Sequence, residues 1–284
     1  MRKKEEVIKQ ILDFANEDER VRAVMLNGSR VNPNAPKDLM QDYDVIFFIT
    51  DIENISYKIN RQWINRFGET VIIQQNDFED GSYVFLMQFK DGVRIDLNFK
   101  DILKIEKTAE EDSLSKILLD KDDIAPIIHE ANDSSYFVNK PSKNEFDKAM
   151  NNLWWIQTYV AKGIWRDELP LAKYMFDVIL IDGIHKLLYW NIGIKHDWKI
   201  NVGKCGRWFN KFLPDEIYKE FISLYPTIDY DQMWESLFAA GSFIRKIGTE
   251  VSENLGYTYP KEEDMNVSEY IRKIKELPKD AIDF

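Results

Sequence analysis

A change in hydrophobic pattern near residues 133–141 constrains the fold more than any other feature of the sequence. Before it, short apolar runs rich in β-branched and aromatic residues are separated by turn residues, which is typical of strands. After it, apolar residues recur almost throughout at helical spacing. We therefore expect an α+β chain. Its N-terminal domain, residues 1–140, would hold a mixed sheet flanked by helices, and residues 141–284 would form an all-helical bundle domain.

The expected strands of the first domain are the runs VRAVMLN, DYDVIFFIT, ETVIIQ, SYVFLMQF and VRIDLNF. The last two are separated by Lys90, Asp91 and Gly92, and an Asp-Gly pair between apolar runs indicates a hairpin. Helical spacing predicts helices in this domain over 5–16 and 57–67. In the second domain we expect helices over 143–162, 169–191, 214–225 and 231–255, and another near the C-terminus.

Composition restricts the possible partners and the compartment. The formal net charge is -11 and the isoelectric point is about 5.0, whereas nucleic-acid binders usually carry a basic face, so we expect no nucleic-acid partner. Cys205 is the only cysteine, which excludes an intrachain disulfide. No apolar run has the length of a membrane span or of a signal peptide, so we expect a cytoplasmic protein without a membrane partner. The sequence does not indicate whether it is a monomer or a dimer.

Gly28 and Ser29 directly follow the first expected strand. A glycine lets the backbone approach a phosphate closely, and free N–H groups with a hydroxyl can hold the phosphate oxygens. The alternative interpretation of this pair, taken alone, is a plain turn.

Asp42 and Asp44 stand two residues apart at the start of the second expected strand. Residues at this spacing point to the same face of a strand, so their carboxylates repel each other unless a cation lies between them. Mg²⁺ prefers oxygen ligands and binds through a few carboxylates together with substrate phosphates. A solvated strand end is the alternative for an isolated Asp-x-Asp pair.

Asp96 interrupts the apolar strand VRIDLNF, with Ile95 and Leu97 on the opposite face. An acidic residue on a core strand usually needs a cation or a hydrogen-bond donor as its partner. The alternative is that this face of the strand is exposed to solvent.

The order of these three pieces is more specific than any one of them. A strand with Gly-Ser, a loop, Asp-x-Asp on a strand and then a hairpin with a third Asp resembles the polymerase β-like nucleotidyltransferases. LNGSRVNPNAPKDLMQDYDVIFFITD, DGVRIDLNF, LWWIQTYVAKGIWRDELPLAKYMFD and VGKCGRWFNKFL further resemble the aminoglycoside 6-adenylyltransferases, which modify streptomycin. This resemblance extends to about residue 260.

The resemblance implies a role for each matching residue. Gly28 and Ser29 match the turn that grips phosphate, and Asp42 and Asp44 match the pair that binds metal. Asp96 matches the third carboxylate, which is a metal ligand, the general base, or both. Two further residues are candidates for the nucleotide phosphates: Lys204 in the VGK segment matches a basic position near the triphosphate, and Arg30 would add positive charge.

The implied reaction transfers AMP from ATP to a hydroxyl of an aminoglycoside, with two Mg²⁺ ions held by the three aspartates. We expect the acceptor between the two domains, where carboxylates and aromatic faces would suit its amino or guanidinium groups. The candidate acceptor residues are Trp154, Tyr159, Glu145 and Asp182, and Asp182 is favoured because it lies in an apolar stretch where a charge needs a partner. The alternative for the aromatic residues is core packing.

Two other functions remain open at this stage. The same chemistry with another acceptor, either a different antibiotic or a protein hydroxyl, would leave the N-terminal motifs unchanged. A catalytically silent nucleotide-binding protein is the other alternative, although the presence of all three aspartates argues against it.

Overall fold

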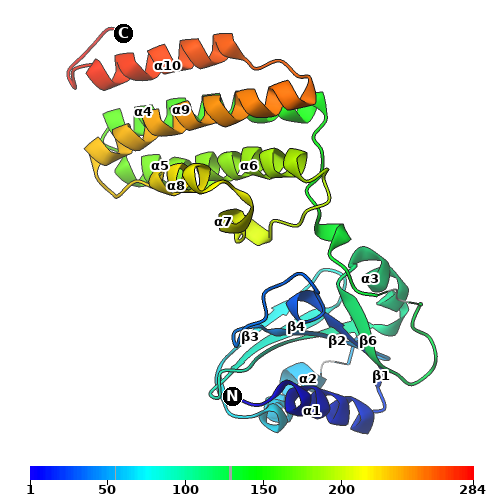
Figure 1. The fold of residues 1–284 in the computed structure, drawn as a ribbon. Helices are drawn as coiled ribbons and strands as arrows, with labels where there is room; N and C mark the ends of the chain where they lie inside the picture. The colour runs from blue at the N-terminus through cyan, green and yellow to red at the C-terminus, as the bar shows by residue number, and fades with distance from the viewer. Residues whose placement is uncertain (55, 128–129) are drawn as a thin grey trace. The chain divides into compact units, whose positions relative to one another are not determined.

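The structure is a computed structural model that describes residues 1–54, 56–127 and 130–284. The chain divides into two compact units, Met1–Ser135 and Tyr136–Phe284, a few residues before the boundary expected at 140. The first unit contains a six-stranded sheet and the second is helical, so the expected α+β class is confirmed (Figure 1).

The sheet of the first unit has the strand order β3-β4-β5-β2-β1-β6. Strands β2 and β5 run parallel, whereas their other pairings within the sheet are antiparallel, so the sheet is mixed as expected. The strands are β1 Val21–Asn27, β2 Tyr43–Ile49, β3 Thr70–Asp77, β4 Tyr83–Phe89, β5 Arg94–Asp101 and β6 Ser115–Asp120.

The two faces of this sheet pack differently. One face is covered by helix α1, Lys4–Glu17, and by the short helix α2, Ser56–Ile59, and their contact with it forms the larger core (Figure 1). On the other face, Ile105 of helix α3, Ile105–Glu111, packs in a smaller cluster with residues such as Met25 and Phe48. Because strand side chains alternate, Asp44 and Asp96 lie on the face with the smaller cluster.

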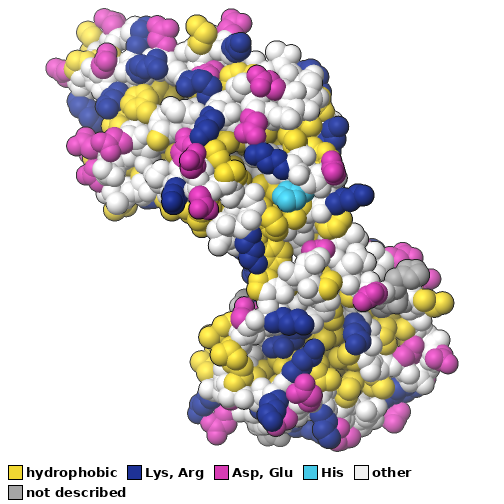
Figure 2. Space-filling view, in the orientation of Figure 1, with side chains coloured by type: hydrophobic (Ala, Val, Ile, Leu, Met, Phe, Trp, Pro, Cys, Tyr) yellow, Lys and Arg dark blue, Asp and Glu magenta, His cyan; other side chains and the backbone are white. Residues whose placement is uncertain are grey.

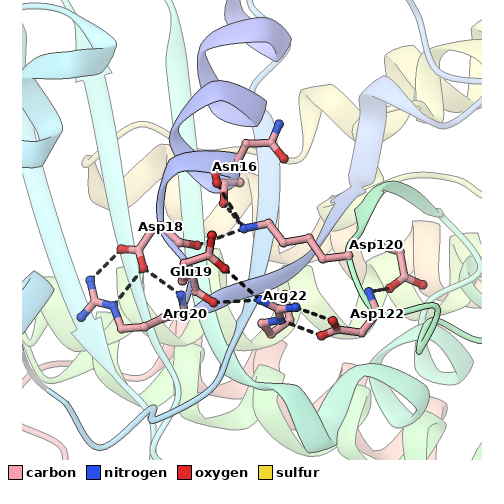
Figure 3. A network of polar contacts seen from close by, with 9 residues as sticks. Asn16, Asp18, Glu19, Arg20, Arg22, Asp120 and Asp122 are labelled. Atoms are coloured by element: carbon pink, nitrogen blue, oxygen red, sulfur yellow. Dashed lines mark hydrogen bonds and ion pairs between the residues drawn. The ribbon is translucent and has the colours of Figure 1, made fainter.

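A polar network fixes the point where α1 leads into β1 (Figure 3). The Arg20 guanidinium donates to Asp18 from Nε at 3.0 Å and from Nη2 at 2.7 Å, and Arg22 Nε donates to Asp122 at 2.6 Å. Asp122 lies two residues beyond the end of β6, so the second contact ties the start of β1 to the end of the strand beside it.

The sequence-based expectations for this unit were incomplete in two places. The helix expected over 57–67 is interrupted at Asn60, whose backbone is extended and whose side chain accepts from Gln62 N; a 3-10 helix, Arg61–Phe67, follows. The sequence analysis also missed α3 and β6. Both are short, and β6 is an edge strand with a half-exposed face, so neither gives a strong periodic pattern.

The second unit is built around α4, α6 and α9, which supply most of its core. Its helices are α4 Lys143–Trp165, α5 Leu169–Tyr174, α6 Ile181–Lys195, α7 Phe209–Phe212, α8 Asp215–Ser223, α9 Tyr230–Leu255 and α10 Lys261–Glu276. The helix expected over 169–191 corresponds to α5 and α6, which are joined by a π-helical segment, Met175–Leu180. None of the helices in the described residues combines the length and the apolar character that crossing a membrane requires.

An ion pair between a half-exposed arginine and a buried aspartate links α9 to α10. Asp264, which is almost fully buried, accepts from Arg245 Nε at 2.6 Å and from Arg245 Nη2 at 2.5 Å. The Tyr259 hydroxyl and the Ser268 hydroxyl also donate to this carboxylate, at 2.8 and 3.1 Å. The carboxylate is therefore fully engaged in holding the last helix against the bundle.

Candidate active site

A row of polar residues crosses four neighbouring strands of the sheet. Asp44 on β2 is the register partner of Asp96 on β5, and on its other side it is paired with Asn27 on β1. Asn27 in turn is paired with Ser115 on β6. Side chains of register partners share a face, so the sheet itself places two of the three candidate metal ligands next to each other.

Asp44 lies in an environment that disfavours its charge. Burial, followed by the negative charges of Asp96 and Asp42, raises the pKa of Asp44 to about 6. Asp112 also contributes negative charge, whereas Arg94 acts in the opposite direction. A carboxylate of this kind is stabilised by an added cation or by a proton.

Gly28 begins a short turn after β1 and lies directly against Asp44. Its φ is +73°, and a Cβ added to it would lie 2.3 Å from Oδ2 of Asp44. Only glycine fits here without moving the carboxylate. The Gly28 N–H donates to the carbonyl of Leu114 at 3.2 Å, so this N–H is not available to a phosphate. Of the expected phosphate turn, it is Ser29 whose hydroxyl can serve as a donor.

Arg30 is engaged with the backbone that leads into β2. Its Nε donates to the carbonyl of Asp42 at 2.9 Å, and its Nη2 donates to that of Gln41 at 2.6 Å. The guanidinium carbon also lies 3.5 Å from the centre of the Tyr43 ring. Arg30, expected at the nucleotide phosphates, is in this structure a clamp on the segment that carries Asp42.

Arg94 was missed by the sequence analysis, although the spacing of Arg94 and Asp96 on one strand was a usable signal. Its Nε and Nη2 donate to the two oxygens of Asp96 at 2.8 and 2.7 Å, and its Nη1 lies 3.6 Å from Oδ2 of Asp42. The hydrogen bonds to Asp96 raise the pKa of Arg94. This arginine therefore brings Asp42 and Asp96 to one guanidinium.

Asn27 and Asp112 were also missed, and they extend the row away from Asp96. The Asn27 side-chain amide Nδ2 donates to Asp112 Oδ2 at 3.0 Å and to Ser115 Oγ at 2.9 Å. Its other end, Oδ1, is buried and accepts no hydrogen bond within the described part of the chain. No sequence motif marks an unsatisfied amide oxygen, so only the structure reveals it.

The donor set fits a divalent cation. It consists of carboxylate oxygens, the ligands that Mg²⁺ prefers, around a half-buried Asp44, whose register partner Asn27 has an unsatisfied Oδ1. Within residues 1–54, 56–127 and 130–284, no three acidic, histidine or cysteine side chains are preassembled as a ligand set. The guanidinium of Arg94, already paired with Asp96 and Asp42, supplies positive charge there instead.

Lys204 and Glu145, both expected at the substrates, line one hollow of the helical unit. This hollow has a volume of about 560 Å³, and its charged lining residues are Lys140, Glu145, Lys186 and Lys204. Glu145 also has a structural function: its Oε2 accepts from the backbone N–H and the hydroxyl of Ser142, both at 2.8 Å, and so caps α4.

The other expected acceptor residues fall in different environments. Trp154 is 1% exposed and belongs to the helical core, so it has no free face for a ligand and its function is packing. Tyr159 is exposed, beside the exposed Trp155, with their ring centres 6.2 Å apart. Asp182 is exposed on the outer side of α6, so the expectation that an apolar surrounding forces it to have a partner is wrong. The buried residues of that stretch lie on the other side of the helix.

The net negative charge of the chain does not indicate where a charged ligand binds. On the face of the helical unit drawn in Figure 2, acidic side chains are interspersed with Lys and Arg.

Comparison with known proteins decides the family. The model of the streptomycin adenylyltransferase family matches residues 1–274. The chain belongs to the streptomycin adenylyltransferase family. The resemblance drawn from the sequence motifs is thereby confirmed.

Relatives of this family cover almost the whole chain. The aminoglycoside 6-adenylyltransferase of Bacillus subtilis (strain 168) is 35% identical over 96% of this chain and 98% of its own length. The enzyme of the same name from Campylobacter jejuni is 35% identical over 97% of this chain and 96% of its own length. A solved aminoglycoside 6-adenyltransferase from Bacillus subtilis is similar over 97% of this chain and 99% of that one, at 30% identity and a TM-score of 0.50.

Membership of the streptomycin adenylyltransferase family establishes the class of reaction. The chain is a nucleotidyltransferase. The family implies ATP as the co-substrate and a divalent metal ion as the cofactor.

Proposed function

We propose that this protein transfers AMP from ATP to a hydroxyl of an aminoglycoside, namely the hydroxyl at the 6-position of streptomycin, and releases pyrophosphate. The observation that carries the proposal is the register pairing of Asp44 with Asp96 beside Gly28, which places carboxylates next to one another on a partly buried face of the sheet. Relatives that match over nearly their full length are aminoglycoside 6-adenylyltransferases, which supports the choice of acceptor.

In this proposal, Asp42, Asp44 and Asp96 would hold two Mg²⁺ ions. These ions would neutralise the charge of the phosphates and make the acceptor hydroxyl more acidic. The acceptor oxygen forms a bond to the α-phosphorus while the bond from that phosphorus to the bridging oxygen of pyrophosphate breaks. Asp96, at the edge of the polar row, takes the hydroxyl proton or orients the hydroxyl. Because Arg94 donates to both oxygens of Asp96, it fixes the orientation of this carboxylate.

The phosphates of ATP require donors from this chain. Ser29 lies in the turn after β1, next to Gly28, which is in close contact with Asp44, and its hydroxyl is the donor that we assign to the phosphates. Lys204, with Lys140 and Lys186 lining the same hollow, is the other candidate, because three ammonium groups with one carboxylate favour an anion. The same balance of charge makes that hollow unsuitable for a polycationic aminoglycoside.

The acceptor is a polycation, so it requires exposed carboxylates or aromatic faces. Tyr159 and Asp182 are exposed and remain candidates for this role. Glu145 is disfavoured because it lines the lysine-rich hollow and caps α4, and Trp154 is excluded by its burial.

The decisive experiment measures pyrophosphate release by the purified protein with ATP, Mg²⁺ and a panel of aminoglycosides, with mass spectrometry of each acceptor. We expect an AMP adduct on streptomycin that disappears with EDTA and with Asp44→Asn. An adduct on a different aminoglycoside only would replace the acceptor and keep the site. Absence of any adduct, together with ATP binding that Asp44→Asn does not change, would contradict the catalytic assignment.

A further inference from the structure

Arg94 has a contact pattern that a simple surface arginine does not have. It precedes Asp96 by two residues on β5, so both side chains lie on the same face of the strand. The guanidinium donates to both oxygens of Asp96 and also approaches Oδ2 of Asp42 at 3.6 Å. A planar fork that engages both oxygens of one carboxylate is a strong and oriented interaction.

The same guanidinium is a cation beside the site where a metal ion has to bind. Asp42 and Asp96 are two of the three proposed metal ligands, and Arg94 pairs with both of them.

We propose that Arg94 is a resident counter-ion that holds the carboxylates in place without a divalent ion and competes with that ion for Asp42 and Asp96. This inference rests on the proposed function, because it takes those carboxylates to be the metal ligands. Two cations near the same carboxylates repel each other, so the affinity of the site for a divalent ion is lower with Arg94 than without it. Conversely, without a divalent ion the protein depends on Arg94 to balance the negative charge of these carboxylates.

The test uses the full chain and Mn²⁺ as the probe, with binding followed by titration calorimetry. Arg94→Gln keeps a hydrogen-bond donor but removes the charge. We expect it to bind Mn²⁺ at least roughly tenfold more tightly than the unmodified protein. We also expect a lower Tm in EDTA and a larger rise in Tm on adding Mn²⁺. Arg94→Lys keeps the charge without the fork, so its affinity should stay close to that of the unmodified protein.

Arg66→Gln is the matched control. Arg66 loses the same charge but pairs with Glu17 of α1, and its guanidinium lies over the ring of Phe14 in the core on the other face of the sheet. Mn²⁺ affinity should not change in this variant. A comparable gain in Arg66→Gln would mean that net charge alone is responsible and would overturn the proposal.

Asp44→Asn separates failure of this inference from failure of the proposed site. If Asp44→Asn binds Mn²⁺ as well as the unmodified protein, the ion binds elsewhere, and the site and the inference are both wrong. If Asp44→Asn loses binding while Arg94→Gln binds Mn²⁺ equally or more weakly, the metal site stands and the counter-ion role of Arg94 is overturned.

Discussion

Asp44 and Asp96 are register partners on the parallel strands β2 and β5. The chain between them forms α2, the 3-10 helix and the strands β3 and β4, and then returns to place β5 against β2. The two carboxylates are therefore brought together by the topology of the sheet rather than by a local motif. Their mutual repulsion is part of what raises the pKa of Asp44, and this leads to the first prediction.

Asp44→Asn should abolish turnover but stabilise the protein in the absence of metal. The folded pKa of Asp44 is about 6, above its ordinary value of 3.8. The folded state therefore favours the protonated carboxyl group. The stability that goes with this protonated form is fully present below pH 4 and is lost as the pH rises through 6. At pH 8 in EDTA, the variant should be more stable by roughly 2–3 kcal/mol. Near pH 4 the two proteins should be alike.

The measurement is chemical denaturation at pH 4, 6 and 8 in EDTA, together with an activity assay at pH 8. Glu110→Gln is the control, since it removes an exposed carboxylate from α3 of the same unit. A variant Asp44→Asn that is less stable at every pH, or that retains normal turnover, would contradict this account of the site.

Gly28→Ala should reduce turnover strongly while it reduces the stability of the fold only slightly. An added Cβ meets Oδ2 of Asp44 at 2.3 Å, so the carboxylate has to move. Gly81→Ala is a matched control, because Gly81 has a similar φ of +82° and no atom within 4 Å of an added Cβ. Both variants should lose about 1 kcal/mol of stability from the strained backbone. Only Gly28→Ala should lose turnover, by roughly a hundredfold or more. Equal activities would show that the contact with Asp44 is unimportant.

Arg30 can be tested for its role as a clamp. Arg30→Lys keeps the charge but cannot donate to the carbonyls of Asp42 and Gln41 as a fork. If the clamp matters, Arg30→Lys and Arg30→Ala should lower kcat to a similar extent, by roughly tenfold, with little change in the KM for ATP. Restoration of kcat by the lysine variant would instead assign Arg30 to the phosphates, as the sequence first indicated.

The ion pair of Asp264 in the helical unit allows a test of stability that does not involve the site. Asp264→Ala leaves the Tyr259 hydroxyl without its acceptor and removes the carboxylate from the half-exposed Arg245 guanidinium. We expect a loss of about 2 kcal/mol in denaturation, with unchanged Mn²⁺ binding. Glu269→Ala, at an exposed position on the same helix, should change stability by less than about 0.5 kcal/mol. Similar losses in both variants would mean that the pair contributes little.

Much of the site was predictable from the sequence because its parts are local. The position of Gly28 after a strand and the alternation of Ile95, Asp96 and Leu97 follow from the two-residue period of a strand. The mixed sheet and the helical second unit follow from the change in hydrophobic pattern, and family resemblance added the reaction class.

The features of the site that the sequence did not predict depend on contacts between residues far apart in the chain. Arg30 was expected at phosphates because an arginine after a glycine turn suggests this, but the shape of the loop before β2 brings backbone carbonyls to it. Trp154 and Trp155 are adjacent, and only the packing of α4 decides that Trp154 is buried while Trp155 is exposed. The free Oδ1 of Asn27 requires knowledge of every neighbour, which no single-sequence pattern contains.

The hairpin between β4 and β5 has a consequence for the tolerance of this enzyme to insertions and deletions. Its turn is closed by Gly92 with φ +89° and by Arg2, whose Nε donates to Asp91 at 2.8 Å. The number of residues in this turn sets the phase of β5 against its neighbours. Gaining or losing a single residue there would turn Ile95 or Leu97 towards Asp44 and send Asp96 into the aromatic core. A length change in a turn without any catalytic group should therefore be as harmful to the enzyme as replacing an aspartate.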